Sequence, residues 1–316
     1  MGFKVDDVTR ALVTGGAGFI GSHIVGELLQ RGASVRVLDN FSSGKRENLE
    51  SFHGDLEIQE GDLRDPDAIK AAINNMELVF HLAAFISVPQ SMQEPENCFT
   101  INVAGTAKLL EAAHQAGVSK VVLSSSSAVY GNTDKFPTDE KTPLNPLSPY
   151  ALSKQVNELY ARLYTQTFNL PVVALRYFNV YGPRQNPDSA YAAAISIFAR
   201  RLVNGEPITI FGDGKQSRDF IFVKDVVRAN LQAAESVAAG EAFNICTGQE
   251  TSLLDLLEVL SEVSPQLPEV RFEAPRPGDI YRSLGNPEKA ANALGFRAGI
   301  SLADGLAQTV DWMKNK

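Results

Sequence analysis

Tyr150 and Lys154 are the two residues of this 316-residue chain whose types and spacing most directly suggest chemistry. A separation of four residues places two side chains on the same face of a helix, and Pro149 marks a helix start. A free tyrosine has a pKa of about 10, and a nearby ammonium group favours the phenolate and lowers that pKa. The pair could then remove a proton from an alcohol while hydride leaves the same carbon. A packed ring beside a lysine is also common on helices, so this interpretation depends on the upstream residues.

A glycine-rich turn follows the first predicted strand, residues 11–14. Gly15, Gly18 and Gly21 have the spacing Gly-x-x-Gly-x-x-Gly and lead into an amphipathic helix predicted over residues 20–31. Glycine permits a tight turn, and a helix start offers unpaired N–H groups to a pyrophosphate. Because the motif lies between a strand and a helix, it predicts dinucleotide binding rather than a purely structural turn.

Asp39 ends the second predicted strand. A carboxylate there can accept hydrogen bonds from the adenosine ribose and would repel a 2′-phosphate, which favours NAD over NADP. We interpret Arg36, Lys45 and Arg46 as solvated surface charges. Asp62, at the end of the third strand, could meet the adenine or be an ordinary acid in a turn.

The first half of the chain alternates strands and helices, which implies a parallel sheet covered on both faces. The predicted strands are 11–14, 34–39, 56–59, 78–82, 120–124 and 172–176, and the predicted helices are 20–31, 66–74, 101–115 and 150–168. Beyond Tyr177, prolines divide the pattern into short pieces. We therefore expect an α/β fold: a Rossmann-type doubly wound parallel sheet with a smaller C-terminal substrate-binding α/β region.

Composition narrows the class of protein. A net charge of −8 argues against sequence-independent nucleic-acid binding and against attraction to anionic membranes. Cys98 and Cys246 are far apart, and neither they nor the 4 histidines have a metal-binding spacing, so we expect no metal. No apolar run has membrane-spanning length and no signal peptide is recognisable, so we expect a cytoplasmic protein.

Over nearly its whole length the chain resembles the extended short-chain dehydrogenase/reductases. The shared features, in family order, are the glycine motif, Asp39, Asp62, the run from His81 to Ala84, Asn102, the run from Ser124 to Gly131, and Tyr150-x-x-x-Lys154. The resemblance implies that Ser126 binds the reacting hydroxyl beside Tyr150 and Lys154. Ser124 would lie toward the nicotinamide, since alternate residues of a strand share one face.

The resemblance also implies an NAD site built from the glycine turn, the strand ends and the catalytic helix. In it, Asp62 and the neighbouring backbone amide would meet the adenine, and Asn102 would shape the active site. The expected residues are Gly15, Gly18, Phe19, Ile20, Gly21, Asp39, Asn40, Ser43, Gly44, Asp62, Leu63, Leu82, Ala83, Ala84, Asn102, Ser124, Tyr150, Lys154 and Tyr177.

Three later segments, residues 175–184, 212–225 and 276–279, resemble nucleotide-sugar epimerases and dehydratases. This implies that Asn179, Arg218 and Arg276 hold the diphosphate of a UDP- or dTDP-sugar and that Asp279 meets the nucleotide ribose. A planar guanidinium suits that task because it can bind two oxygens at once. We accordingly expect residues 1–176 to form the NAD-binding domain, rejoined by part of 218–247, and residues 177–316 to form mainly the UDP-sugar-binding domain.

The residues after Ser126 distinguish among the reactions of these relatives. Family dehydratases carry an Asp-Glu pair there and UDP-glucuronate decarboxylases a glutamate, whereas this chain has Ser127 and Ala128. The resemblance therefore favours C4 epimerisation of a UDP-hexose through a 4-keto sugar. Tyr150 would take the 4-hydroxyl proton, Ser126 would share that hydrogen bond, and the anchored diphosphate would hold the sugar while it turns over.

Substrate breadth is predicted from residue size. A bulky tyrosine at the position of Ser283 restricts relatives to unacetylated hexoses, so a serine predicts turnover of UDP-GlcNAc/UDP-GalNAc as well as UDP-Glc/UDP-Gal. Residues 186–193 also resemble the branch that accepts acetylated sugars. In the alternative, a shift of two residues would let Tyr281 fill the pocket.

Three further expectations complete the prediction. A UDP-glucuronate 4-epimerase or a reductase is the nearest rival, and Ser87 would be a substrate contact or merely a loop cap. A non-catalytic NAD-binding module is a second rival, which the joint presence of Ser126, Tyr150 and Lys154 argues against. Family likeness implies a homodimer through a four-helix bundle of helices 97–115 and 150–168. Its seam would draw on Leu109, Leu110, Ala113, Leu159 and Leu163, unless these face the sheet.

Overall fold

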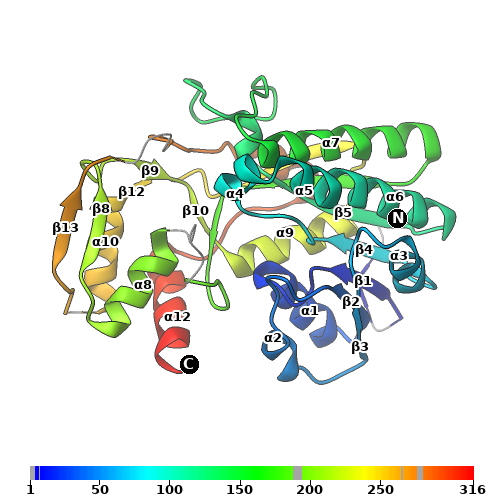
Figure 1. The fold of residues 1–316 in the computed structure, drawn as a ribbon, viewed down its shortest axis with the longest axis horizontal. Helices are drawn as coiled ribbons and strands as arrows, with labels where there is room; N and C mark the ends of the chain where they lie inside the picture. Colours follow the sequence, from blue (N-terminus) through cyan, green and yellow to red (C-terminus); the bar gives the residue numbers. More distant parts are fainter. Residues whose placement is uncertain (1–3, 7, 188–193, 265, 276–279) are drawn as a thin grey trace.

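The computed structural model describes residues 4–6, 8–187, 194–264, 266–275 and 280–316. Arg276 and Asp279, both predicted to bind substrate, lie outside the described residues, as do residues 188–193 of the segment thought to indicate acetylated sugars. A larger body surrounds a central sheet, and a smaller part, which includes the C-terminus, lies beside it (Figure 1). Within the described ranges, no helix has both the length and the apolar character needed to cross a membrane.

The central sheet has seven parallel strands in the order β11-β6-β5-β4-β1-β2-β3. This confirms the predicted Rossmann-type doubly wound sheet. The strands are β1 (Arg10–Thr14), β2 (Ser34–Asp39), β3 (Leu56–Glu60), β4 (Leu78–His81), β5 (Lys120–Ser126), β6 (Val172–Tyr177) and β11 (Glu241–Ile245). The sequence did not predict β11, which comes from the second half of the chain and pairs with β6.

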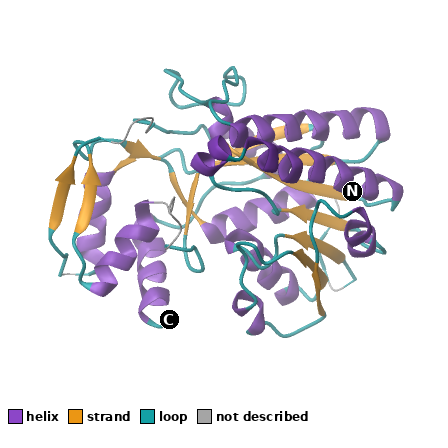
Figure 2. Ribbon diagram, in the orientation of Figure 1, coloured by secondary structure: helices purple, strands orange, loops and turns teal. Residues whose placement is uncertain are grey.

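Helices cover both faces of the sheet (Figure 2). One face packs on α1 (Phe19–Gln30), α2 (Glu47–Glu50), α9 (Val223–Glu235) and α11 (Glu288–Leu294); the other packs on α3 (Pro66–Ile73), α6 (Thr106–Gln115) and α7 (Pro149–Phe168). Val13 belongs to the first core and Leu12 to the second, because successive strand residues point to opposite faces. The strands therefore read as continuous apolar runs.

The strand order reverses between β1 and β4, and ligands of such sheets bind beyond the carboxyl ends of the strands at this point. Thr14 and His81 are the last residues of these two strands, and Gly15 follows directly. The glycine turn, the strand β5 serines and the start of α7 therefore lie along one edge of the sheet.

The smaller part is the predicted C-terminal α/β region. It contains three two-stranded sheets and a core of its own formed by α8 (Ala194–Asn204), α10 (Leu253–Val263) and α12 (Leu302–Lys314). The sheets pair β7 (Asn179–Tyr181) with β10 (Phe220–Phe222), β9 (Ser217–Arg218) with β12 (Thr251–Ser252), and β8 (Ile208–Phe211) with β13 (Val270–Glu273). The β7–β10 and β9–β12 pairs bring Asn179 and Arg218 to the large sheet's carboxyl edge.

Local sequence explains where the catalytic helix α7 begins and ends. The Ser148 side chain caps it by accepting a hydrogen bond from Ala151 N at 3.1 Å, and Pro149 occupies the first turn. Asn169 ends it in the left-handed conformation, with φ of 54°.

The helix predicted over residues 101–115 begins earlier and is not regular. Helix α4 (Val88–Gln93) and α5 (Pro95–Phe99) lead into a π-helical turn, η1 (Thr100–Gly105), and then into α6. On α6, Leu109, Leu110 and Ala113 are fully buried against the sheet, so they cannot form the dimer seam suggested for them. Leu159 and Leu163 on α7 are exposed, at 57% and 47%.

Candidate active site

A cavity of about 310 Å³ lies between the carboxyl edge of the sheet and the smaller part. Six of the predicted site residues line it: Ser126, Tyr150, Tyr177, Asn179, Arg218 and Ser283. They come from β5, α7, β6, β7, β9 and the loop before α11. Fold geometry thus brings the predicted hydroxyl-binding and diphosphate-binding groups into one space.

Tyr150 and Lys154 lie near each other on α7 without a direct hydrogen bond. Lys154 Nζ is 5.8 Å from the centroid of the Tyr150 ring and donates to Ser124 O at 2.9 Å and Ser124 Oγ at 3.2 Å. Burial lowers the pKa of Lys154 to about 8 and raises the pKa of Tyr150, against a smaller lowering by the hydrogen bond with Ser126. The Tyr150 pKa is therefore raised by burial, whereas the sequence led us to expect that it would be lowered.

Strand β5 separates its serines as the pleat requires. Ser124 and Ser126 point toward Lys154 and Tyr150, whereas Ser125 is buried on the other side and donates to Glu158 Oε1 at 2.5 Å. Glu158 also pairs with Arg176 at 2.7 Å with both side chains nearly buried. Ser127 begins a short 3₁₀ turn, η2 (Ser127–Tyr130).

The glycine turn is packed too tightly for larger residues. A Cβ on Gly15, whose φ is +70°, would lie 2.6 Å from Ala83 N, and a Cβ on Gly21 would collide with Gly15 O. Gly18 caps α1 without a side-chain hydrogen bond, and a Cβ there would meet only Gly15 O. This open helix start fits a dinucleotide pyrophosphate.

Asp39 is held at the end of β2 beside this turn. Its carboxylate accepts from Ala17 N at 2.9 Å and from Phe41 N at 2.8 Å, and a Cβ on Gly44 would lie 2.9 Å from Asp39 Oδ2. Burial raises the pKa of Asp39, partly offset by these two hydrogen bonds. The carboxylate is thus fixed where a ribose is expected, while Ser43 is exposed on the following loop.

Asp62 is engaged by other side chains. It accepts two bonds from the Arg64 guanidinium and one from Asn40 Nδ2, all at 2.8 Å. The Arg64 hydrogen bonds hold the pKa of Asp62 well below its usual range. An adenine would therefore meet an Asp62 carboxylate that is already ionised and oriented.

Several predicted cofactor residues use their side chains for packing. Leu63 is buried in the sheet core, Leu82 and Ala83 pack against opposite faces of the sheet, and Phe19 and Ile20 pack on the core of the smaller part. Ala84 follows them and is half-buried. Because the side chains are packed, these residues would have to bind a cofactor through their backbone groups. Their contacts with a cofactor stay predictions.

Asn102 holds the loop after β4 against α7. Its Nδ2 donates to Phe85 O at 3.0 Å and to Ser153 Oγ at 2.9 Å, and its Oδ1 accepts from Phe85 N at 2.7 Å. The π-helical turn carries Asn102, which is 1% exposed. The residue shapes the site by fixing the backbone around Phe85.

Sequence reasoning gave His81 no role, but it lies at the centre of a buried chain of hydrogen bonds. Its Nδ1 is 2.6 Å from Thr14 Oγ1 and its Nε2 is 2.9 Å from Thr106 Oγ1, which also accepts from Asn157 Nδ2 at 3.2 Å. Burial lowers the pKa of His81 to about 3, so the ring is neutral. The chain joins the end of β1 to α7 one turn beyond Lys154.

Ser283 and Tyr281 lie on different sides of one short segment. Ser283 lines the cavity, and its amide donates to Ser217 O at 3.1 Å. Tyr281 is 60% exposed, and its hydroxyl donates to Asp213 Oδ2 at 3.2 Å. The alternative in which Tyr281 fills the cavity therefore does not hold in this structure.

Arg282, between those two residues, was missed as a cavity residue. Its guanidinium binds Glu250 with two bonds of 2.8 and 2.6 Å and lies 4.5 Å from the centroid of the Phe136 ring. Both Arg282 and Phe136 line the cavity. No local motif signals this cluster, because its members are far apart in sequence. Ser87 instead caps α4 by accepting from Gln90 N at 3.1 Å, which is the second of the two alternatives given for it.

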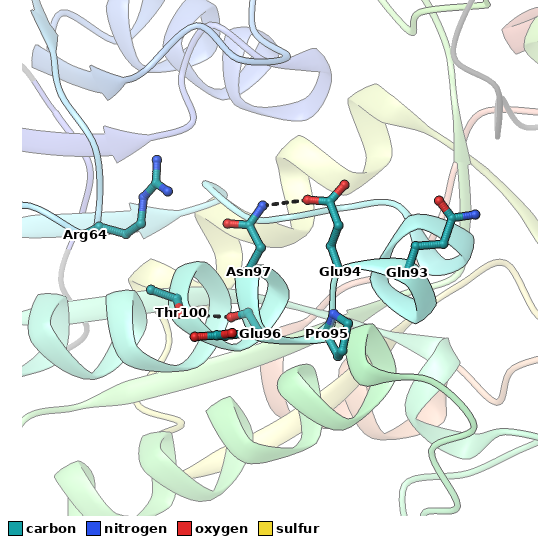
Figure 3. Close-up of a pocket in the computed structure, with 7 residues that line it drawn as sticks. All are labelled: Arg64, Gln93, Glu94, Pro95, Glu96, Asn97 and Thr100. Carbon is teal, nitrogen blue, oxygen red and sulfur yellow. Dashed lines mark hydrogen bonds between the residues drawn. The ribbon is translucent and has the colours of Figure 1, made fainter.

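A separate hollow lies at the turn between α4 and α5 (Figure 3). Arg64 and mostly exposed polar residues line it, and Asn97 Nδ2 donates to Glu94 Oε2 there at 3.0 Å. The described residues also include no group of His, Cys, Asp or Glu that could hold a metal ion. The chemistry-bearing residues gather in the first cavity.

Comparison with known proteins agrees with this geometry. The "NAD dependent epimerase/dehydratase" family profile matches residues 11–246. A UDP-glucose 4-epimerase of Mycolicibacterium smegmatis is 42% identical over 311 residues, covering 97% of this chain and 99% of that protein.

Two solved structures are similar along almost their whole length. A Thermotoga maritima UDP-glucose 4-epimerase with UDP-glucose has a TM-score of 0.92 and 40% identity, covering 97% of this chain and 99% of that one. A Methanobrevibacter ruminantium UDP-N-acetylglucosamine 4-epimerase in complex with UDP-N-acetylmuramic acid has a TM-score of 0.93 and 41% identity, covering 98% of each chain. With its glycine turn, its Tyr150–Lys154 helix and these likenesses, the chain belongs to the NAD dependent epimerase/dehydratase family, within the extended short-chain dehydrogenase/reductases.

Proposed function

We propose that the protein epimerises UDP-hexoses at C4 through a transient 4-keto sugar, with NAD retained between turnovers. The observation that carries this proposal is the shared cavity of Ser126, Tyr150, Asn179, Arg218 and Ser283. Ser127 and Ala128 line it next to Ser126, and no acidic side chain is among the described residues that line it. The cavity thus offers a proton acceptor for an alcohol but no carboxylate for dehydration or for assisting decarboxylation.

Each residue has a distinct part in the proposed reaction. Tyr150 takes the proton of the sugar 4-hydroxyl, and Ser126 shares that hydrogen bond. Bound NAD would accept the C4 hydride and return it, and the positive charge of its oxidised ring would favour the Tyr150 phenolate. Lys154 adds a second positive charge close to the phenolate. Asn179 and Arg218, with Arg276 and Asp279 by family likeness, hold the UDP moiety while the sugar turns over.

NAD itself would be held by the open start of α1 at Gly18 and by the fixed carboxylate of Asp39. The remaining cofactor residues, Asn40, Ser43, Gly44, Asp62, Tyr177 and the packed apolar residues of the turn, would complete that site. We also propose that residues 1–176, with part of 218–247, form the NAD-binding domain.

We propose a broad sugar specificity that includes 2-acetamido sugars. Supporting this, Ser283 is small and lines the cavity, while the bulky Tyr281 lies outside it against Asp213. The likeness to an enzyme named for UDP-N-acetylglucosamine agrees with the same proposal.

A homodimer through α5, α6 and α7 is also proposed. Phe99, Leu152, Leu159 and Leu163 are large apolar residues of α5 and α7 exposed at 47–58%, and an exposed apolar stripe on a helix favours association. Replacing Leu159 with glutamate should yield monomers in light scattering. The matched control is Val237→Glu, an exposed apolar residue in the segment after α9 rather than on these helices, which should leave the mass unchanged. A monomeric wild type would contradict the proposal.

The proposed reaction is tested by proton NMR of the purified protein with UDP-galactose and with UDP-GalNAc, with no cofactor added. Appearance of the gluco-configured products of both supports a broad C4 epimerase that carries its own NAD. Conversion of UDP-galactose alone would support C4 epimerisation but would contradict the proposed turnover of 2-acetamido sugars. No conversion of either would favour the rivals, a UDP-glucuronate 4-epimerase, a reductase or a non-catalytic NAD-binding module.

A further inference from the structure

Asp219 is a fully buried carboxylate, 0% exposed, directly after the predicted diphosphate ligand Arg218. Its Oδ1 accepts from Thr247 N at 2.8 Å and from Thr247 Oγ1 at 2.7 Å. Its Oδ2 accepts from Gly248 N at 2.9 Å and from Gly285 N at 3.3 Å. Four donors on one carboxylate compensate the loss of water around the charge, and the salt bridges of the described residues include none at Asp219.

The backbone of the same residue reaches the other substrate segment. Asp219 O accepts from Asn179 N at 3.0 Å and from Asn179 Nδ2 at 3.3 Å. This double contact fixes both the main chain and the carboxamide of Asn179 where β7 pairs with β10. Asp219 therefore orients one predicted diphosphate ligand, Asn179, directly. It is the chain neighbour of the second, Arg218.

The side chain connects two further segments near the cavity, the one after β11 and the one after Ser283. Gly285 comes two residues after Ser283, and a Cβ on Gly285 would lie 2.6 Å from Cys246 Sγ, so this segment packs closely on the end of β11. Thr247 and Gly248 continue from that end toward Glu250, which binds Arg282. Through its carboxylate and its backbone oxygen together, Asp219 thus links the segments that carry Asn179, Arg218, Arg282 and Ser283.

We propose that Asp219 is a positioning residue for the substrate: it assembles the diphosphate-binding side of the cavity and takes no part in holding NAD. This inference rests on the proposed function, because it assigns Asp219 to the binding of a UDP-sugar. A neutral amide cannot replace the carboxylate, since its NH₂ group would face backbone N–H donors. The geometry of the anion site is therefore expected to depend on the charge state and shape of this one side chain.

The test is titration calorimetry of UDP, together with the NAD content of each purified protein. Asp219→Asn should weaken UDP binding at least tenfold and raise KM for the UDP-sugar more than it lowers kcat, with the NAD content unchanged. Asp225→Asn is the matched control, because Asp225 is also 0% exposed and also accepts from backbone amides, Gly299 N and Ile300 N, both at 3.0 Å. That variant should lose stability while binding UDP as wild type does.

A milder variant covers the case in which Asp219→Asn does not fold. Thr247→Val removes one hydroxyl donor to Asp219 and should weaken UDP binding by a smaller factor of two or more. Wild-type UDP affinity in Thr247→Val or in Asp219→Asn, or equal loss of NAD and UDP, would overturn the positioning role. A wild-type protein that binds no UDP at all would instead overturn the proposed function, and this inference with it.

Discussion

Lys154 Nζ lies 5.8 Å from the centroid of the Tyr150 ring and donates its hydrogen bonds to Ser124. The lysine makes no direct hydrogen bond to the phenol, so an effect of its charge on Tyr150 requires action through space. Lys154 is buried and Tyr150 is half-buried, and for both groups loss of water disfavours the charged form. The phenolate therefore depends on nearby positive charge.

Tyr150→Phe should lower kcat roughly a thousandfold, since it removes the general base and leaves the ring in place. UDP binding and NAD content should change little, because the residues proposed to hold the UDP moiety and the pyrophosphate are untouched. Tyr160→Phe on the same helix is the control and should retain full activity. Turnover near the wild-type rate in Tyr150→Phe would show that another group takes the proton.

Lys154→Met should move the acid limb of the pH profile of kcat to higher pH. Tyr150 must lose its proton to act, so activity rises with pH through its pKa, and loss of a nearby positive charge raises that pKa. Rates measured from about pH 6 up to the ordinary tyrosine pKa of about 10 would show the displacement. An unshifted limb would mean that the Lys154 charge does not govern Tyr150.

Ser283→Tyr should reduce kcat/KM for UDP-GalNAc by about tenfold or more relative to UDP-galactose, because the larger ring takes the space of the acetamido group. Tyr281→Ala is the control, since Tyr281 lies outside the cavity. If Tyr281→Ala changes the preference and Ser283→Tyr does not, the loop in solution is shifted from the arrangement described.

His81 predicts an acid-sensitive fold. Its folded pKa of about 3 lies below the ordinary value of 6.5, so the stability it contributes is complete above pH 6.5 and is lost as the pH falls toward 3. At about pH 5 the loss from this group is about 2 kcal/mol. Urea unfolding measured at about pH 7 and 5 should therefore show a smaller drop in the free energy of unfolding for His81→Gln than for wild type. His114→Gln, at an exposed site, should lose as much as wild type, and an equal loss in His81→Gln would contradict the assignment.

The parts of the fold that sequence reasoning predicted are those encoded by short-range patterns. The glycine turn, the apolar strands and the Tyr150–Lys154 helix each have a local signal that depends on neighbouring residues alone. Strand β11 has no such signal, because its place beside β6 is set by contacts between distant parts of the chain.

The site was predicted in part for the same reason. Ser126, Asn179, Arg218 and Ser283 lie in recognisable motifs, and the fold brings them to one cavity. The roles of Asp219, His81 and Arg282 depend on partners tens of residues away, which no motif reveals. From the sequence, Leu109 and Leu110 could face either a dimer partner or the sheet, and only the folded structure shows that they pack on the sheet.

The most direct test of the central claim is proton NMR of UDP-galactose turnover in D₂O, with enzyme and no added cofactor. C4 epimerisation by hydride removal and return predicts UDP-glucose whose C4 position keeps its protium and whose other carbon-bound positions carry no deuterium. Deuterium at C4 would mean proton exchange with solvent and would contradict the hydride route. Deuterium at C5 or C6, with loss of the 6-hydroxyl, would reveal dehydration instead.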